Sequence, residues 1–149
     1  MIESRYPARI KESIWRLSDH TLLIDLHIFS EDTIPKRKLK ASSVPDICIG
    51  TNPDYTPEHL KKSAISIFSE AGCRVMENDP FSGCIVPKVV YEATEECRFN
   101  CIMIQVNESI CLDQEGDVIP EQASKIREIL KKLILEYDRG EINHYGREE

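Results

Sequence analysis

The run Cys101–Glu108 constrains the fold of this chain more than any other segment. Its first six positions are apolar apart from Gln105, and it ends in polar residues. An apolar run of this length predicts a buried β-strand over Phe99–Val106. A second run, Thr21–Phe29, is interrupted by Asp25 and His27 and predicts a strand buried on both faces, as is typical of parallel sheets.

The remaining segments supply further strands and helices. We expect helices over Tyr6–Leu17, from Pro57 to Ala71, and from about Pro120 to Tyr137, with additional strands over Asp46–Gly50 and Cys73–Met76. In the second helix Thr56 is the predicted cap, Pro57 fits the first position, and Gly72 lies just past the end. The order predicts one α/β domain over residues 1–149, with three layers and a mostly parallel or mixed central sheet between helices.

The amino-acid composition limits the kinds of binding partner and the cellular compartment that we expect. The net charge of −7 disfavours nucleic acid and anionic membrane as partners, because both need a positive surface. No apolar run approaches the roughly 18 residues of a membrane span, and the first residues carry no signal-peptide core, so we expect a cytoplasmic chain. In that setting the six cysteines are predicted to be reduced and mostly buried, and no Cys-x-x-Cys spacing indicates a metal knuckle.

Four short polar segments could carry chemistry or simply end structural elements. His27 follows Asp25 at the end of a predicted strand, where it is either a metal ligand oriented by the carboxylate or an ordinary edge residue. Gly50-Thr51 and Pro80-Phe81-Ser82-Gly83 are turns that could also approach a ligand closely. The basic stretch within Ser30–Pro45 is either a solvated loop or a lid that attracts anions.

In this order and with these separations, the segments resemble the N-formylglutamate amidohydrolase family of zinc hydrolases. The resemblance covers about Tyr6 to Leu133 and implies an incomplete phosphorylase/hydrolase-like fold. It implies zinc as the cofactor, His27 as a zinc ligand, and N-formyl or N-acyl amino acids as substrates. It places Thr51, Ser82, Gly83, Asn107 and Glu108 at substrate-binding positions, and Gln105 at the catalytic position.

Two of these positions depart from the family pattern. Gln105 stands where the family has the Glu that moves protons, and an amide cannot gain and lose a proton near neutral pH. Glu108 stands where the family has an Arg that pairs with the substrate carboxylate, and a second carboxylate repels it. Asp25 and Glu77 are the candidates that could substitute for the missing acid/base.

The resemblance also implies an N-terminal strand and zinc-ligand segment that we expect to be absent. A sheet without that strand would have an uncovered edge, so we expect a homo-oligomer or a partner chain to cover it. Three readings follow: a truncated or degenerate member with little or no hydrolysis, an active zinc amidohydrolase whose missing ligands come from a partner chain, or a non-catalytic interaction module that shares only the fold.

Overall fold

The computed structural model of the chain describes residues 20–35, 43–92 and 98–145. The helix predicted over Tyr6–Leu17 and the basic residues 36–40 of the predicted lid lie outside the described residues. Within the described part, none of the helices is long and apolar enough to cross a membrane.

A four-stranded mixed sheet forms the middle layer of the fold. The strands β1 (His20–Phe29), β2 (Ile47–Gly50), β3 (Val75–Glu77) and β4 (Arg98–Asn107) lie in the order β1-β4-β2-β3. β1 is parallel to β4 and β2 is parallel to β3, but β2 is antiparallel to β4. The predicted α/β fold with a mixed sheet is therefore confirmed.

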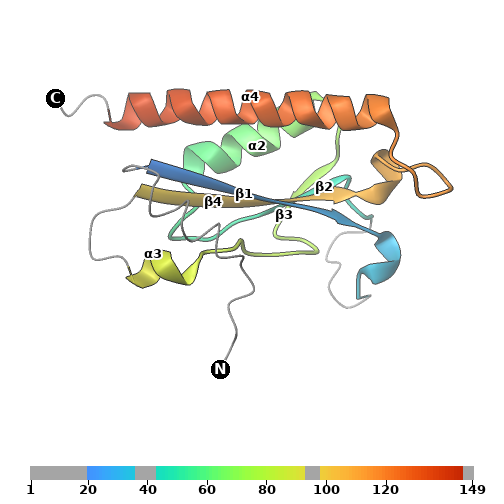
Figure 1. The fold of residues 1–149 in the computed structure, drawn as a ribbon, viewed down its shortest axis with the longest axis horizontal. Coiled ribbons are helices and arrows are strands. Elements are labelled where there is room, and N and C mark those ends of the chain that lie inside the picture. Colours follow the sequence, from blue (N-terminus) through green and yellow to red (C-terminus); the bar gives the residue numbers. More distant parts are fainter. Residues whose placement is uncertain (1–19, 36–42, 93–97, 146–149) are drawn as a thin grey trace.

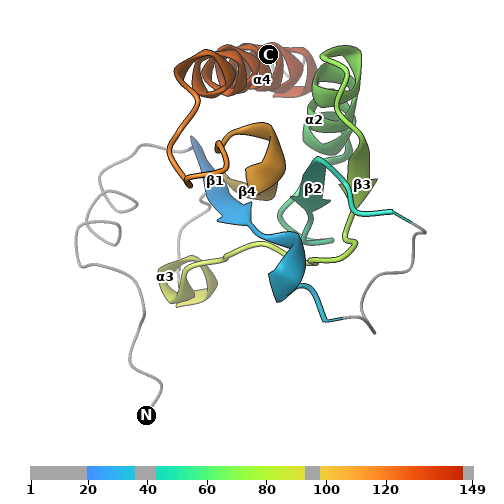
Figure 2. The ribbon, with the colours of Figure 1, turned by 90° about the vertical axis from the view of Figure 1, so that its right-hand side faces the viewer.

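Helices cover both faces of this sheet. The long helices α2 (Glu58–Glu70) and α4 (Pro120–Tyr145) lie together on one face, and the short helix α3 (Lys88–Glu92) lies on the other (Figures 1 and 2). Two 3₁₀ turns follow the strands β1 and β4: η1 (Glu31–Thr33) and η2 (Glu108–Ile110).

The alternation of side chains along β4 decides what each face of the sheet contains. Ile102, Ile104 and Val106 are buried in the hydrophobic core against α2 and α4. The intervening side chains of Met103 and Gln105 therefore point to the opposite face, because successive residues of a strand face opposite sides. We call this second face, on which α3 lies, the α3 face.

The core is built from one stripe of each long helix. Leu60, Ala64 and Phe68 of α2 and Leu133 and Tyr137 of α4 are almost fully buried. Their spacing of four residues puts them on the same side of each helix. The Tyr137 hydroxyl reaches the sheet, where it accepts a hydrogen bond of 2.7 Å from the Asn100 side chain.

Two expectations about local structure are wrong. Pro57, not Thr56, is the cap residue of α2, and the Thr56 hydroxyl instead donates to the Cys101 carbonyl oxygen at 2.7 Å. β1 is not buried on both faces, because it is the outer strand of the described sheet and its residues 26–28 are exposed. The short helix α3 lies in a segment for which the sequence analysis assigned no element, since five residues are too few to show a helical period.

The expectation that all cysteines are reduced is also wrong. Cys84 and Cys101 form a disulfide, with Cα atoms 6.4 Å apart, whereas Cys48, Cys73 and Cys111 are unpaired thiols. The bond joins the segment after β3 to the α3 face of β4. The pairing depends on how the loop folds over the sheet, which no local spacing of cysteines encodes.

Leu133 and Leu135 of α4 make a matched test of this packing. Leu133→Ala should lower the free energy of unfolding by about 2–5 kcal/mol, because Leu133 is fully buried. Leu135→Ala, at a position 57% exposed in the same helix, should change it by less than about 0.5 kcal/mol. Urea unfolding followed by circular dichroism measures both, and equal losses in the two variants would contradict the placement of α4.

Candidate functional site

The α3 face of β1 carries an Asp–His pair. The Nε2 atom of His27 lies 2.6 Å from Oδ1 of Asp25, and the two residues are two positions apart, so they share a face of the strand. The Asp25 side chain is 14% exposed and the His27 side chain 46% exposed. The carboxylate therefore fixes the imidazole orientation while one side of the ring remains open to solvent.

Gln105 lies beside His27 on the neighbouring strand. The two are register partners in the parallel pairing of β1 with β4, and Cys48 of β2 is the register partner of Gln105 on its other side. Adjacent strands are about 4.8 Å apart. The Gln105 amide makes a long hydrogen bond of 3.7 Å to the Met103 sulfur. The sheet thus places His27 and Gln105 side by side.

The direction of β2 separates Thr51 from the exits of β1 and β4. Strand ends form one ligand-binding edge only where the strands are parallel, and β2 runs antiparallel to β4. Gly50 is opposite Met103, in the middle of β4. Thr51 therefore lies beyond Gly50 toward the amino end of β4, whereas Asn107 and Glu108 lie at the carboxyl end of β4.

Asn78 connects Thr51 to the loop that contains Gly83. Its Oδ1 atom accepts hydrogen bonds from the backbone N–H groups of Thr51 at 3.0 Å and Gly83 at 3.2 Å. Its Nδ2 group donates to the Thr51 hydroxyl at 2.8 Å. The N–H of Gly83, which was predicted to face a substrate, is thus occupied within the chain.

The loop after β3 folds over the α3 face. The Cys48 thiol donates to the Phe81 carbonyl oxygen at 3.2 Å, and the Phe81 ring packs edge-on against Phe29 with centroids 5.2 Å apart. A Cβ atom at Gly50 would overlap the Gly83 carbonyl oxygen. The absence of a side chain at Gly50 therefore allows this loop to approach β2 closely. The sequence analysis had instead suggested that a ligand could approach closely at Gly50.

The other predicted substrate residues have different surroundings. Ser82 is exposed at the loop surface. Asn107 is only 2% exposed, and its side chain accepts from the Ser109 N–H at 3.0 Å and donates to the Pro45 carbonyl oxygen at 3.2 Å. These contacts start η2 and hold the segment before β2, so Asn107 is a structural residue here.

Glu108 lines an acidic hollow at the carboxyl ends of β1 and β4. The hollow has a volume of about 480 Å³ and is lined by η1, η2 and the turn after η2. It contains five carboxylates and no Lys or Arg among its lining residues: Glu31, Asp32, Glu108, Asp113 and Glu115. A negatively charged substrate group would be repelled at this place.

The zinc expected from the resemblance needs more ligands than the described residues bring together. A catalytic zinc ion is usually held by three protein side chains. Among residues 20–35, 43–92 and 98–145, no group of three or more His, Cys, Asp or Glu side chains is arranged to hold a metal ion. Within the described residues, His27 and Asp25 alone do not make up a zinc site.

Neither alternative carboxylate is a free group beside Gln105. Glu77 is the register partner of Ile49, a core residue, so it faces α2 and not the α3 face. There it pairs with Lys61 of α2 at 3.3 Å. Asp25 does lie on the α3 face, but its carboxylate is engaged by His27.

The unpaired cysteines do not provide a nucleophile either. Burial raises the pKa of the Cys48 thiol above its usual range. Burial, and second the charge of Asp46, raises the pKa of Cys73. Because the thiolate is the reactive form, both stay protonated near neutral pH.

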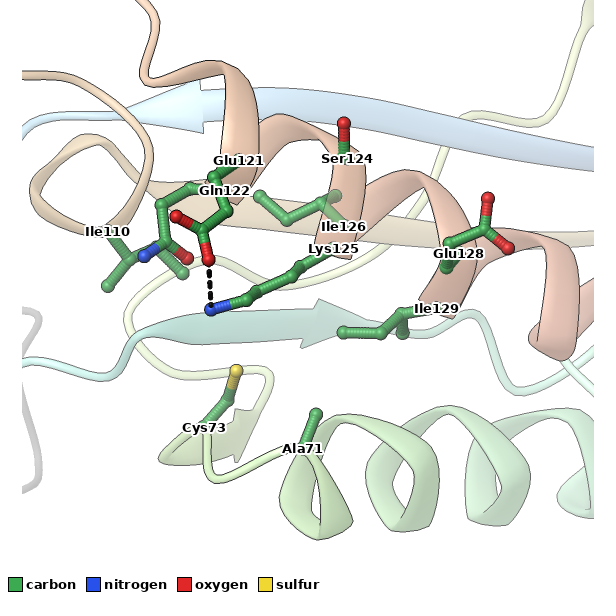
Figure 3. Close-up of a pocket in the computed structure, with 10 residues that line it drawn as sticks. All are labelled: Ala71, Cys73, Ile110, Glu121, Gln122, Ser124, Lys125, Ile126, Glu128 and Ile129. Atoms are coloured by element: carbon green, nitrogen blue, oxygen red, sulfur yellow. Dashed lines mark ion pairs between the residues drawn. The ribbon is translucent and has the colours of Figure 1, made fainter.

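A second hollow lies far from these residues, on the helix side of the sheet. Figure 3 shows it between α4 and the end of α2, with Cys73, Ile126 and Ile129 on its walls and an ion pair between Glu121 and Lys125. Its volume is about 450 Å³. None of the predicted site residues lines it.

Asn78 is the residue that the sequence analysis missed. A signal was present, because Asn tolerates positive φ and is followed by Asp79-Pro80, a combination typical of turns. In the structure Asn78 has φ of 52°. Its long-range hydrogen bonds to Thr51 could not be read from the turn alone.

The fold is a three-layer α/β arrangement, with Asp25, His27 and Gln105 on one face of its sheet. The sequence profile of the N-formylglutamate amidohydrolases matches residues 5–112, and the chain belongs to that family. The crystal structure of N-formylglutamate amidohydrolase from Ralstonia eutropha JMP134 is similar, with a TM-score of 0.63 and 17% identity. The match covers 88% of this chain and 49% of that one, so the chain spans about half of that protein's length. None of the curated proteins matches.

Asn78 offers a test of the loop that covers the site. Asn78→Ala should lower the free energy of unfolding by about 1–3 kcal/mol, because two partly buried N–H groups lose their acceptor. Asn78→Asp keeps an acceptor oxygen for both N–H groups and should cost clearly less. Chemical denaturation of the two variants measures the difference, and an equal loss would show that the Thr51 and Gly83 contacts do not stabilise the loop.

Proposed function

We propose that this chain is a degenerate member of its family, with little or no hydrolysis of N-formyl or N-acyl amino acids. The observation that carries the proposal is Gln105 beside His27. General acid/base catalysis contributes roughly 10²–10⁴-fold to such reactions and needs a group that exchanges a proton near neutral pH. Asp25 lies on the same sheet face, two residues before His27, and His27 engages its carboxylate.

Two further features support the same proposal. Glu108 belongs to an acidic hollow, which opposes binding of a substrate carboxylate. The described metal-binding side chains of one chain are too few for a catalytic zinc site. Each of these three features alone would lower hydrolase activity. Gln105 opposes proton transfer, the acidic hollow opposes substrate binding, and the small set of ligands opposes metal binding.

A second reading remains open because the Asp25–His27 pair is intact. Its half-exposed imidazole lies on an outer strand, where a partner chain could reach it. In this reading the protein is a zinc amidohydrolase whose remaining ligands come from that partner. The acidic net charge favours a small-molecule or protein partner over nucleic acid or membrane. The cytoplasmic location stays a prediction. The Cys84–Cys101 disulfide disfavours it, because reducing compartments rarely maintain such a bond.

Formate release from N-formylglutamate, measured with added zinc, distinguishes the two readings. We expect the wild-type chain to release no formate above the protein-free blank, and Gln105→Glu to remain at the blank as well. In the partner-completed reading, Gln105→Glu should raise formate release by roughly 10²–10⁴-fold. Release by the wild-type chain that is lost in His27→Ala would contradict the proposal, and release that persists in His27→Ala would indicate a contaminating enzyme.

A further inference from the structure

An apolar hollow of about 300 Å³ lies between the end of β1 and the start of α4. Its walls include Leu26, which is 49% exposed, and Ile28 and Val118, which are 56% and 58% exposed. Of its lining residues only Arg127 is charged. Contiguous apolar surface of this kind marks a place where another segment or molecule packs.

The apolar surface continues from the hollow along one side of α4. Ala123, Arg127 and Leu130 line the hollow, and Ile134 follows one turn later and is 43% exposed. Their spacings of three and four residues put these four side chains on the same side of the helix. We call this side of α4, together with the hollow, the β1–α4 strip.

α4 runs antiparallel to β1, so the two ends of the strip lie over different ends of the strand (Figure 1). At the start of β1, Nε2 of His20 forms a hydrogen bond with the Tyr137 hydroxyl, near the end of α4. At the end of β1, Leu26 shares the hollow with Ala123, near the start of α4. The chain that enters β1 at His20 therefore comes from beside the Tyr137 end of α4.

The residues before His20 lie outside the described part of the chain, but their sequence predicts a helix over Tyr6–Leu17. The apolar residues of this segment recur at helical spacing: Tyr6, Ile10, Ile14 and Leu17. Three residue steps from Leu17 to His20 span at most about 10 Å. The end of the segment is thus tethered within about 10 Å of the contact between His20 and Tyr137.

We propose that the Tyr6–Leu17 segment docks as a helix beside α4, parallel to it, and covers the β1–α4 strip. Packed helices lie about 8–10 Å apart, a distance that the tether allows. Because both helices rise by about 1.5 Å per residue, Ile14 is then level with Ile134, and Ile10 is level with Leu130. Each apolar residue of the segment therefore meets an apolar position of the strip.

The length of the segment also matches the distance to the hollow. Tyr6 lies eleven residues before Leu17, or about 16 Å along a helix. Leu26 lies six residues after His20, or about 20 Å along a strand. The Tyr6 ring therefore reaches the wall of the hollow at Leu26.

The strip fits the apolar stripe of the segment better than the other face of β1 does. That face carries the Asp25–His27 pair, and an apolar cover would desolvate both polar groups. A segment held by so short a tether is also present at an effective concentration on the order of millimolar, which favours it over a second copy. The inference goes beyond the proposed function, because it concerns the side of the sheet opposite His27 and requires no turnover.

Engineered cysteines test the docking and its register. Facing Cα atoms of two packed helices approach to about 5.5 Å, which suits a disulfide. On mild oxidation, the Ile14→Cys/Ile134→Cys variant should therefore form an intramolecular disulfide, mapped by mass spectrometry of peptides. Its yield should be roughly tenfold or more above that of Ile14→Cys/Leu135→Cys, because Leu135 is exposed and turned by about 100° around α4. Equal yields, or a disulfide formed only between two chains, would overturn the proposal.

Thiol labelling of the full chain tests whether the strip is covered. Leu26→Cys and Leu135→Cys have similar exposure in the described structure, 49% and 57%. We expect N-ethylmaleimide to label Leu26→Cys roughly tenfold or more slowly, because a docked segment must open before the thiol reacts. Adding Ile10→Asp should remove this difference while the buried Cys48 stays unlabelled, which shows that the fold is intact.

Three results of the labelling would overturn the proposal. Equal labelling of Leu26→Cys and Leu135→Cys in the chain with Ile10 would show that the strip is open. Protection of Leu26→Cys that is lost on dilution would show that a second copy covers it. Protection that survives Ile10→Asp would show that the cover does not depend on the apolar stripe of the segment.

Discussion

The pairing of β4 with strands on both sides is the constraint on which the rest of the structure depends. β4 holds β1 in a parallel register over ten residues and β2 in an antiparallel register over four. Its alternation sends Ile102, Ile104 and Val106 into the core and Gln105 to the opposite face. A slip of one residue would exchange these faces and bury Gln105 against α2 and α4. The hydrophobic core and the candidate site are therefore fixed by the same register.

Among the described residues, the loop after β3 covers part of the α3 face. The segment after β3 crosses this face through Phe81 and is held by Asn78 and by the Cys84–Cys101 bond. Because Gly50 has no side chain, the loop can approach β2 closely. The result is a face in which His27 stays half exposed while several predicted ligand-binding groups already bond within the chain.

Apolar periodicity was sufficient to predict the strands and the long helices. The runs of β1 and β4 and the stripe of α2 each appear directly in the sequence. Strand direction was not available, since alternation is the same for a strand read either way. The antiparallel β2, and with it the separation of Thr51 from the strand exits, follows from tertiary pairing that no local pattern records.

Side-chain roles that depend on distant partners were also out of reach. Asn107 has a polar side chain at a family substrate position, yet its contacts with Pro45 and Ser109 make it structural. Thr56 looked like a helix cap because caps are recognised from neighbouring residues, whereas its hydroxyl bonds the Cys101 carbonyl oxygen 45 positions away. The exposure of residues 26–28 reflects the position of β1 at the sheet edge, which the apolar run alone could not reveal.

The register of β1 against β4 is the most direct test of this account, and interstrand backbone nuclear Overhauser effects measure it. The account predicts contacts that pair His27 with Gln105 and Leu26 with Ile104. Contacts displaced by one residue, such as His27 with Ile104, would contradict it. They would place the glutamine on the opposite face from the imidazole and remove the basis for the proposed loss of hydrolysis.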